Sequence, residues 1–190
     1  PTIRSKIIFG ISATLKSLHK KNVIHRNLID YNILLDDKLE PRIGSFSLSR
    51  FINDPFELEF AIGTPMSMAP ELFCDCDYDY GFPVDVYSYS IILYRMFSQE
   101  FHFSHTKIFR NDSDWFRVQI GRGHRPKRPE NIPDHYWELI NRCWNQDPEE
   151  RPTFEEITNI LKDDKYALEE YGMKTNLEEL HEYQRRIDID

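Results

Sequence analysis

Apolar residues near the start of the chain recur with the spacing of one face of an α-helix. The residues on that face are Ile3, Ile7, Ile8, Ile11, Leu15 and Leu18. Polar and charged residues fill the positions between them, which is typical of an amphipathic helix. We expect about five turns, with Thr2 as the N-cap and Lys20 and Lys21 near the negative end of the helix dipole.

Two short apolar runs after this helix predict a small β-hairpin beside a polar loop. Val23–Ile24 and Ile33–Leu35 flank the polar residues 25–32, and Pro41–Ile43 is the expected return strand. Residues 44–70 then show no steady period, so we expect a loop there.

Residues 84–97 are apolar on nearly all faces, which predicts a helix buried at the centre of the fold. Asp85 near its start is unusual, because a buried carboxylate needs partners. A shorter helix is expected from Tyr136 to Trp144, and Pro152 suits the first position of the helix that follows.

Thr175 and Glu178 resemble a capping box that opens a last amphipathic helix. The residues expected along this helix are Leu177, Leu180, Gln184 and Ile187. We expect them to pack on the rest of the domain, and the alternative is a partner protein. Together the elements predict a mainly α-helical domain with one small β-hairpin.

Composition and charge narrow the classes of partner. The chain has 190 residues, 40% of them hydrophobic, which is enough for one compact domain and too few for two. A net charge of -8 argues against a nucleic-acid or anionic-membrane surface, because both select clustered Lys and Arg. No apolar run approaches the roughly 20 residues of a membrane helix.

The cysteines are three in number, Cys74, Cys76 and Cys143, and no C-x-x-C pair occurs. This pattern predicts neither a disulfide framework nor a zinc site, so we expect reduced thiols in a cytoplasmic protein. The first residue is Pro1 rather than Met, and we expect that a segment precedes it.

Residues 25–32 read His-Arg-Asn-Leu-Ile-Asp-Tyr-Asn. This run resembles the catalytic loop of protein kinases, whose pattern is H-R-D-L-x-x-x-N. Ser45-Phe46-Ser47 stand where that family carries D-F-G, and Ala69-Pro70-Glu71 match its A-P-E motif. Gly63-Thr64-Pro65 stand where the family has its substrate-facing loop.

Two further motifs continue the resemblance. Asp85 stands where kinases open their buried central helix with an aspartate, and Cys143-Trp144 through Arg151-Pro152 resembles the C-W-x-x-x-P-x-x-R-P signature of tyrosine-kinase-like and tyrosine kinases. Because all the motifs follow in order with compatible spacing, residues 1–161 resemble the C-terminal, large lobe of a protein kinase of the tyrosine-kinase-like group. Residues 162–190 are then a C-terminal helical extension.

The resemblance implies that several residues have scaffold roles. They are His25, Arg26, Phe46, Glu71, Asp85 and Arg151. In the family, the pair at Glu71 and Arg151 ties the activation segment to the lobe, and the carboxylate at Asp85 holds the loop backbone at His25 and Arg26.

By the same resemblance, the positions that carry the chemistry are substituted. The base position is Asn27, and an amide cannot take the proton of a hydroxyl. The main magnesium ligand of D-F-G is Ser45, and the retained second ligand position, Asn32, is neutral, whereas Mg²⁺ generally binds at least one carboxylate. The lysine position beside the transferred phosphate is Ile29. We therefore predict impaired catalysis, as in a pseudokinase.

Asp30, three residues after Asn27, is a candidate surrogate base, and the alternative is a solvated loop acid near a turn. Hydroxyl residues of the following segment are candidate phosphorylation sites: Ser47, Ser49, Thr64 and Ser67. Arg26 and Arg50 are candidate partners for a phosphate there, and the alternative is an unmodified polar loop.

Nucleotide binding in the family uses a glycine-rich loop and a strand lysine of the N-terminal lobe, and the 190 residues contain no G-x-G-x-x-G run. ATP and Mg²⁺ are therefore implied by family analogy alone, and we expect no cofactor for this lobe by itself. The expected function is a pseudokinase that acts through unidentified protein partners or by allostery. One alternative is an ATP-dependent serine/threonine-type kinase whose N-terminal lobe lies upstream, and another is a truncated gene copy without function.

Overall fold

The computed structural model describes residues 1–52, 63–73, 80–98 and 113–188 of the chain. Cys74, Cys76, residues 53–62 of the predicted loop and residues 189–190 of the expected extension lie outside the described residues. Cys143 is described as a free thiol in the core, and burial raises its pKa to about 12. Such a thiol stays protonated and inert at neutral pH.

Helices dominate the described residues. They are α1 (Thr2–Lys20), α2 (Pro83–Ser98), α3 (Ser113–Gly121), α4 (Asp134–Cys143), α5 (Phe154–Ile160) and α6 (Leu177–Ile187). Short 3₁₀ turns connect them: η1 (Asp30–Asn32), η2 (Phe46–Leu48), η3 (Pro65–Ser67), η4 (Pro70–Phe73), η5 (Pro148–Glu150) and η6 (Asp164–Tyr166). Helix α3 falls in a polar segment for which the pattern predicts no helix.

The described strands form two-stranded antiparallel ribbons. They are β1 (Val23–Ile24) with β4 (Arg50–Phe51), β2 (Ile33–Leu35) with β3 (Pro41–Ile43), and β5 (Glu169–Glu170) with β6 (Met173–Lys174). The β2–β3 hairpin is the predicted one, with Ile33 opposite Ile43. Strand β4 and turn η2 lie in the stretch that was predicted to be loop throughout.

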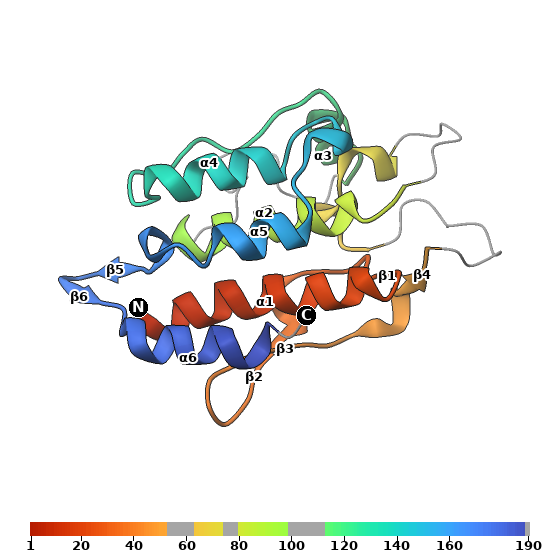
Figure 1. The fold of residues 1–190 in the computed structure, drawn as a ribbon. Helices are drawn as coiled ribbons and strands as arrows, with labels where there is room; N and C mark the ends of the chain where they lie inside the picture. The colour runs from red at the N-terminus through yellow and green to blue at the C-terminus, as the bar shows by residue number, and fades with distance from the viewer. Residues whose placement is uncertain (53–62, 74–79, 99–112, 189–190) are drawn as a thin grey trace.

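Helix α1 lies between α5 and α6, while the central α2 packs on α4, as Figure 1 shows. The prediction of a buried α2 is confirmed, because its residues are buried from Val84 to Tyr94. The hydroxyl of Tyr89 donates to the Ile8 carbonyl at 2.9 Å and so joins α2 to α1. Within the described residues, no helix combines the length and the apolar character that a membrane span needs.

Two predicted helix starts are wrong by one or two residues. Thr2 is the first residue of α1 rather than its N-cap, and its hydroxyl accepts a hydrogen bond from the Asn176 N–H at 2.9 Å. Pro152 lies outside α5, which begins at Phe154 after a capping box formed by Thr153 and Glu156. The Thr153 hydroxyl accepts from the Glu156 N–H and the Glu156 carboxylate accepts from the Thr153 N–H, so the pair gives two backbone donors an acceptor, which a proline at N1 does not.

The predicted capping box of the last helix is also wrong. Asn176 is the N-cap of α6, and its side-chain oxygen accepts from the Glu179 N–H at 3.2 Å. Thr175 is buried, and its hydroxyl donates to the Leu168 carbonyl at 2.8 Å. The sequence 175–179 offers two capping residues in succession, and burial decides between them. Before α6, the expected helical extension also contains the β5–β6 ribbon.

Candidate functional site

Asp85 accepts hydrogen bonds from the backbone of the loop that resembles the kinase catalytic loop. This side chain is fully buried, and its oxygens accept from the N–H groups of His25 at 2.8 Å and Arg26 at 2.9 Å. The imidazole Nε2 of His19 lies 3.0 Å from the same carboxylate. Three donors satisfy the buried charge, so the burial of Asp85 is accounted for. His19 lies on α1, and the sequence pattern did not indicate it as a partner.

A second buried contact joins the segment after the loop to the rest of the domain. The guanidinium of Arg151 binds the Glu71 carboxylate through two hydrogen bonds of 2.6 and 2.8 Å. It also donates to the carbonyls of Pro83 at 3.0 Å and Asn145 at 2.9 Å. Two parallel N–H···O bonds to a carboxylate fix its orientation as well as its charge. The structure thus brings together the pair that the resemblance implies.

The side chain at the base position is fixed in its place. The Asn27 amide oxygen accepts from the Thr64 hydroxyl at 3.1 Å, and Asn32 donates to the Asn27 carbonyl at 2.8 Å. Gly63, just before Thr64, has φ 118°, and a Cβ there would lie 2.7 Å from the Arg26 carbonyl oxygen. Only glycine allows this approach without strain, so it sets how closely the two loops meet.

Ser45 differs from these residues in its surroundings. It is exposed, has a left-handed backbone with φ 62°, and precedes η2 without making a side-chain cap. Next to it, Phe46 is 45% exposed and its ring meets the His25 ring edge-on at 5.1 Å. The His25 Nε2 lies 3.0 Å from the Gly44 carbonyl oxygen. The His25 ring is therefore in contact with Gly44 and Phe46, whereas Ser45 between them is exposed.

A magnesium ion does not fit the residues at this site. Ser45 and Asn32 offer only neutral oxygens, and the described residues contain no group of three acidic, His or Cys side chains arranged to hold a metal. The nearest acid of the loop, Asp30, binds Arg95 of α2 at 2.6 Å. Mg²⁺ sites need at least one carboxylate that can face the ion. Arg95, which the sequence pattern did not indicate, is a charged residue near the end of the mostly apolar helix α2.

Asp36, in the hairpin turn, is also engaged. Hydrogen bonds from the Glu40 and Lys38 N–H groups and from Arg42 hold the pKa of the Asp36 carboxyl below its usual range. The oxygens of Asp36 therefore accept hydrogen bonds within the hairpin turn. This turn holds β2 and β3 in register. The role of Asp30 as a surrogate base stays a prediction, and its ion pair with Arg95 counts against it.

The candidate phosphorylation sites differ in accessibility. Ser67 is buried and donates to the Thr64 carbonyl at 3.1 Å, and Thr64 is bonded to Asn27. Ser49 is half-buried and donates to the His25 carbonyl at 3.3 Å, whereas Ser47 is exposed. Burial of Ser67 leaves Ser47 as the most accessible of the four hydroxyls.

The candidate phosphate partner Arg26 is buried beside these residues. It donates to the Leu48 carbonyl at 2.5 Å and to the Tyr80 hydroxyl at 2.7 Å. Its remaining terminal nitrogen, Nη2, has no hydrogen-bond partner in the part of the chain that the structure describes. Arg50, in contrast, is exposed.

A small hollow of about 120 Å³ lies between the loop, the residues around Thr64 and helix α2. It is lined by Leu28, Ile29, Asp30, Tyr31, Thr64, Met66, Ser67, Ile91, Ile92 and Arg95. Ile29, at the position where the family has a lysine, therefore contributes an apolar wall instead of a cation.

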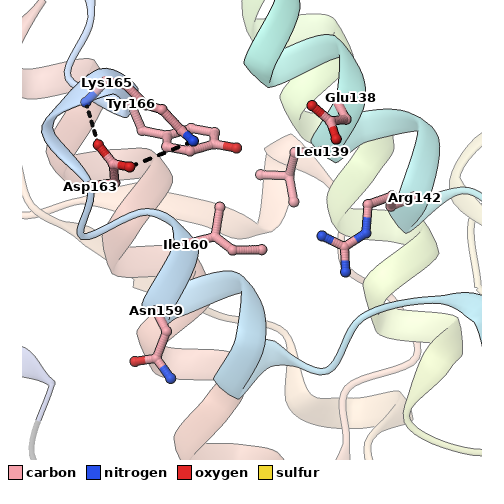
Figure 2. A pocket seen from close by; sticks show the side chains of 8 residues that line it. All are labelled: Glu138, Leu139, Arg142, Asn159, Ile160, Asp163, Lys165 and Tyr166. Carbon is pink, nitrogen blue, oxygen red and sulfur yellow. Dashed lines mark hydrogen bonds and ion pairs between the residues drawn. The ribbon is translucent and has the colours of Figure 1, made fainter.

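A larger hollow of about 460 Å³ lies between α4, α5 and η6 (Figure 2). Leu139 and Tyr166 are buried at its base, and Glu138 and Arg142 extend over it from α4. Asp163 pairs with Lys165 at 3.5 Å on the opposite side, and the charges of Glu138 and Arg142 both act on Tyr166. This hollow could not be predicted from the sequence pattern, because its lining comes from three separate segments.

Comparison with known proteins gives concordant matches. A family model described as "Protein kinase domain" matches residues 2–162. A probable LIM domain-containing serine/threonine-protein kinase of Dictyostelium discoideum is 32% identical over 157 residues, which are 82% of this chain and 23% of that protein. Serine/threonine-protein kinase STY17 of Arabidopsis thaliana is 31% identical over 159 residues, which are 82% of this chain and 26% of that protein.

A further relative, a probable serine/threonine-protein kinase of Dictyostelium discoideum, is 35% identical over 159 residues, or 83% of this chain and 17% of that protein. The chain thus spans between 17% and 26% of the length of these curated relatives.

Proposed function

The chain belongs to the protein kinase family, and from this premise we propose that it is a pseudokinase of the tyrosine-kinase-like group. In this proposal the lobe acts through contacts with protein partners or by allostery and transfers no phosphate. The observation that carries it is the absence of a free carboxylate among the described residues at the positions where the family binds magnesium. The C-W…R-P signature supports the group.

Phosphoryl transfer depends on metal ions that neutralise the phosphates and on a residue that orients the nucleophile. Asn27 can orient a hydroxyl but cannot take its proton, and a general base typically contributes about 10²- to 10⁴-fold in rate. Loss of the base alone would slow an enzyme. Loss of the metal ligand at Ser45 removes the larger electrostatic contribution, so the two substitutions together support inactivity.

A lobe that acts through protein partners needs a surface that a partner can reach. We propose the hollow between α4 and α5 for this role, because it combines an apolar base at Leu139 and Tyr166 with charged side chains of both signs at Glu138 and Arg142 (Figure 2). It lies on helices that carry none of the substituted positions, so a partner there would not compete with nucleotide. A cytoplasmic location stays a prediction from the cysteine pattern.

The test is a phosphotransfer assay on the full-length protein with labelled ATP, Mg²⁺ and a generic protein substrate. The unmodified protein should give no more product than the Asn32→Ala variant, which lacks the one retained ligand position. Turnover well above that variant would contradict the proposal. Nucleotide binding should be measured separately, by the shift of the unfolding temperature with ATP, because a pseudokinase can bind nucleotide without using it.

A second candidate is an active serine/threonine-type kinase, and two hydrogen bonds favour it. The hydrogen bonds from Thr64 and Asn32 hold Asn27 in the place of a catalytic base, so the site keeps its shape. The double variant Asn27→Asp, Ser45→Asp tests how far the remaining site can work. Phosphate transfer by the unmodified protein would support this second candidate, whereas transfer by the double variant alone would contradict it and assign the inactivity to these two residues.

A further inference from the structure

Helix α6 meets α1 and the β2–β3 hairpin at one tightly packed point. Tyr183 of α6 is 4% exposed, and its hydroxyl lies against Gly10 of α1. A Cβ on Gly10 would lie 2.2 Å from that hydroxyl and 2.5 Å from Pro41 of β3. Any side chain at position 10 would therefore require Tyr183 and Pro41 to move. Figure 1 shows α6 along α1, next to β3.

A charged contact extends this junction to the hairpin. Arg186 of α6 donates to the Glu40 carboxylate, whose side chain is only 5% exposed. The backbone of Glu40 closes the hairpin turn through two hydrogen bonds of 3.0 Å with Asp36. The one other cation near the carboxylate in the described residues is Arg42, at 3.8 Å. A buried carboxylate that loses its main cation is strongly destabilised, so Glu40 depends on Arg186.

The far end of α6 is fixed independently. Asp188, directly after the helix, is 4% exposed and forms ion pairs with Lys16 of α1 and, at 2.6 Å, with Lys162. At the start of the helix, Lys6 of α1 binds Glu179 at 2.6 Å. With contacts at its start, middle and end, α6 cannot slide along α1, and Arg186 therefore acts on the hairpin from a rigid support.

The hairpin borders the candidate site directly. Strand β2 begins at Ile33, immediately after Asn32, and the Gly44 N–H that follows β3 donates to the Asn32 carbonyl at 2.8 Å. Ser45 comes next. A displacement of the hairpin must therefore move Asn32 and Ser45 relative to Asn27.

We propose that residues 177–188, the α6 brace, position the β2–β3 hairpin and through it the candidate site, with Arg186 as the positioning residue. This role does not depend on whether the protein transfers phosphate. It implies that a partner which displaces the α6 brace would loosen the site from a distance. Sequence pattern alone places α6 in an extension and gives it no connection to the catalytic-loop region.

Amide hydrogen exchange in the full-length protein, followed by mass spectrometry, tests the proposal. Arg186→Glu should speed exchange in residues 33–43 by about tenfold or more, while residues 84–97 of α2 keep their rate. The charge swap, Arg186→Glu with Glu40→Arg, should bring the hairpin back to within about threefold of the original rate. Glu179→Ala, which removes an ion pair of the same helix far from the hairpin, is the matched control and should leave residues 33–43 unchanged.

A hairpin rate unchanged in Arg186→Glu would overturn the proposal. So would an equal acceleration in the hairpin and in α2, because that pattern reports a loss of global stability rather than of position. Failure of the charge swap to restore slow exchange has the same meaning. Should Arg186→Glu fail to fold, Arg186→Gln removes the charge without reversing it and is judged by the same comparison.

Discussion

Two regions of the candidate site should respond differently to substitution: the buried Asp85, which binds the catalytic-loop backbone, and the exposed Ser45. Asp85 is fully buried, and three donors of the same domain satisfy its charge. Ser45 is exposed and makes no cap. The carboxylate at position 85 has its partners inside the domain. A metal ligand at position 45 would instead bind an ion that is not part of the domain. Loss of a metal ligand at position 45 therefore leaves no buried group without a partner. The domain can stay folded when this ligand is lost.

Asp85→Ala should give the largest effect of any change in this comparison. It leaves the N–H groups of His25 and Arg26 without an acceptor inside the domain. The loss of such a buried charge typically costs about 3–5 kcal/mol in the free energy of unfolding. Urea denaturation monitored by tryptophan fluorescence measures it, with the exposed Asp37→Ala as control. A loss below about 1 kcal/mol would show that the loop backbone does not depend on Asp85.

Arg151→Met should be the next largest change. The variant keeps an unbranched apolar stem but removes the guanidinium, which leaves Glu71 and the carbonyls of Pro83 and Asn145 without their donor. Because Glu71 is 15% exposed and regains some hydration, we expect a loss of about 2–3 kcal/mol in the free energy of unfolding. The same denaturation experiment applies, and Arg122→Met at an exposed position is the control. Equal stability of the two variants would contradict a scaffold role for Arg151.

The sequence predicted local structure better than contacts between distant residues. The apolar residues on nearly all faces of 84–97 were enough to predict a buried α2, and the short apolar run at 33–35 with its expected return strand was enough to predict the hairpin. The third partner of Asp85, His19, lies 66 residues away, and Arg186 lies 146 residues from Glu40. A hydrophobic period tells which face of a helix is buried, but not which helix covers it.

Helix caps show a different limit. Thr175 and Asn176 are both good N-cap residues, so local chemistry could not decide between them. The decision comes from tertiary structure, because the Thr175 hydroxyl binds the Leu168 carbonyl and lies 3.0 Å from the Ser5 hydroxyl of α1. The motif resemblance, in contrast, rests on residue types and not on their surroundings, so it could name the candidate site residues, whose roles stay predictions.

Asp188 provides a pH-dependent test of the α6 brace, with an effect of intermediate size. Burial raises the pKa of its carboxyl, but hydrogen bonds from Lys16 and Lys162 outweigh burial and hold that pKa below its usual range. A group with a lowered pKa in the folded state stabilises the fold above its unfolded pKa, about 3.9, and loses that contribution as the pH falls further.

Asp188→Asn should therefore lower the free energy of unfolding by about 1–2 kcal/mol at neutral pH. The difference from the unmodified protein should shrink as the pH is lowered below about 4. Urea denaturation over a pH series measures both. A difference that is constant with pH would mean that the ion pairs with Lys16 and Lys162 do not contribute.

Ser45→Asp should change stability least and defines the other end of the comparison. Aspartate tolerates the left-handed backbone of this position better than most residues, and the exposed serine makes no cap that the change would remove. We expect the free energy of unfolding to change by less than about 0.5 kcal/mol. The same urea experiment with added Mg²⁺ should show no effect on the unmodified protein and a small stabilisation of the variant, because the new carboxylate faces the solvent beside Asn32. A loss above about 1 kcal/mol in the free energy of unfolding of Ser45→Asp would contradict this comparison. It would mean that position 45 contributes to the stability of the fold as Asp85 does.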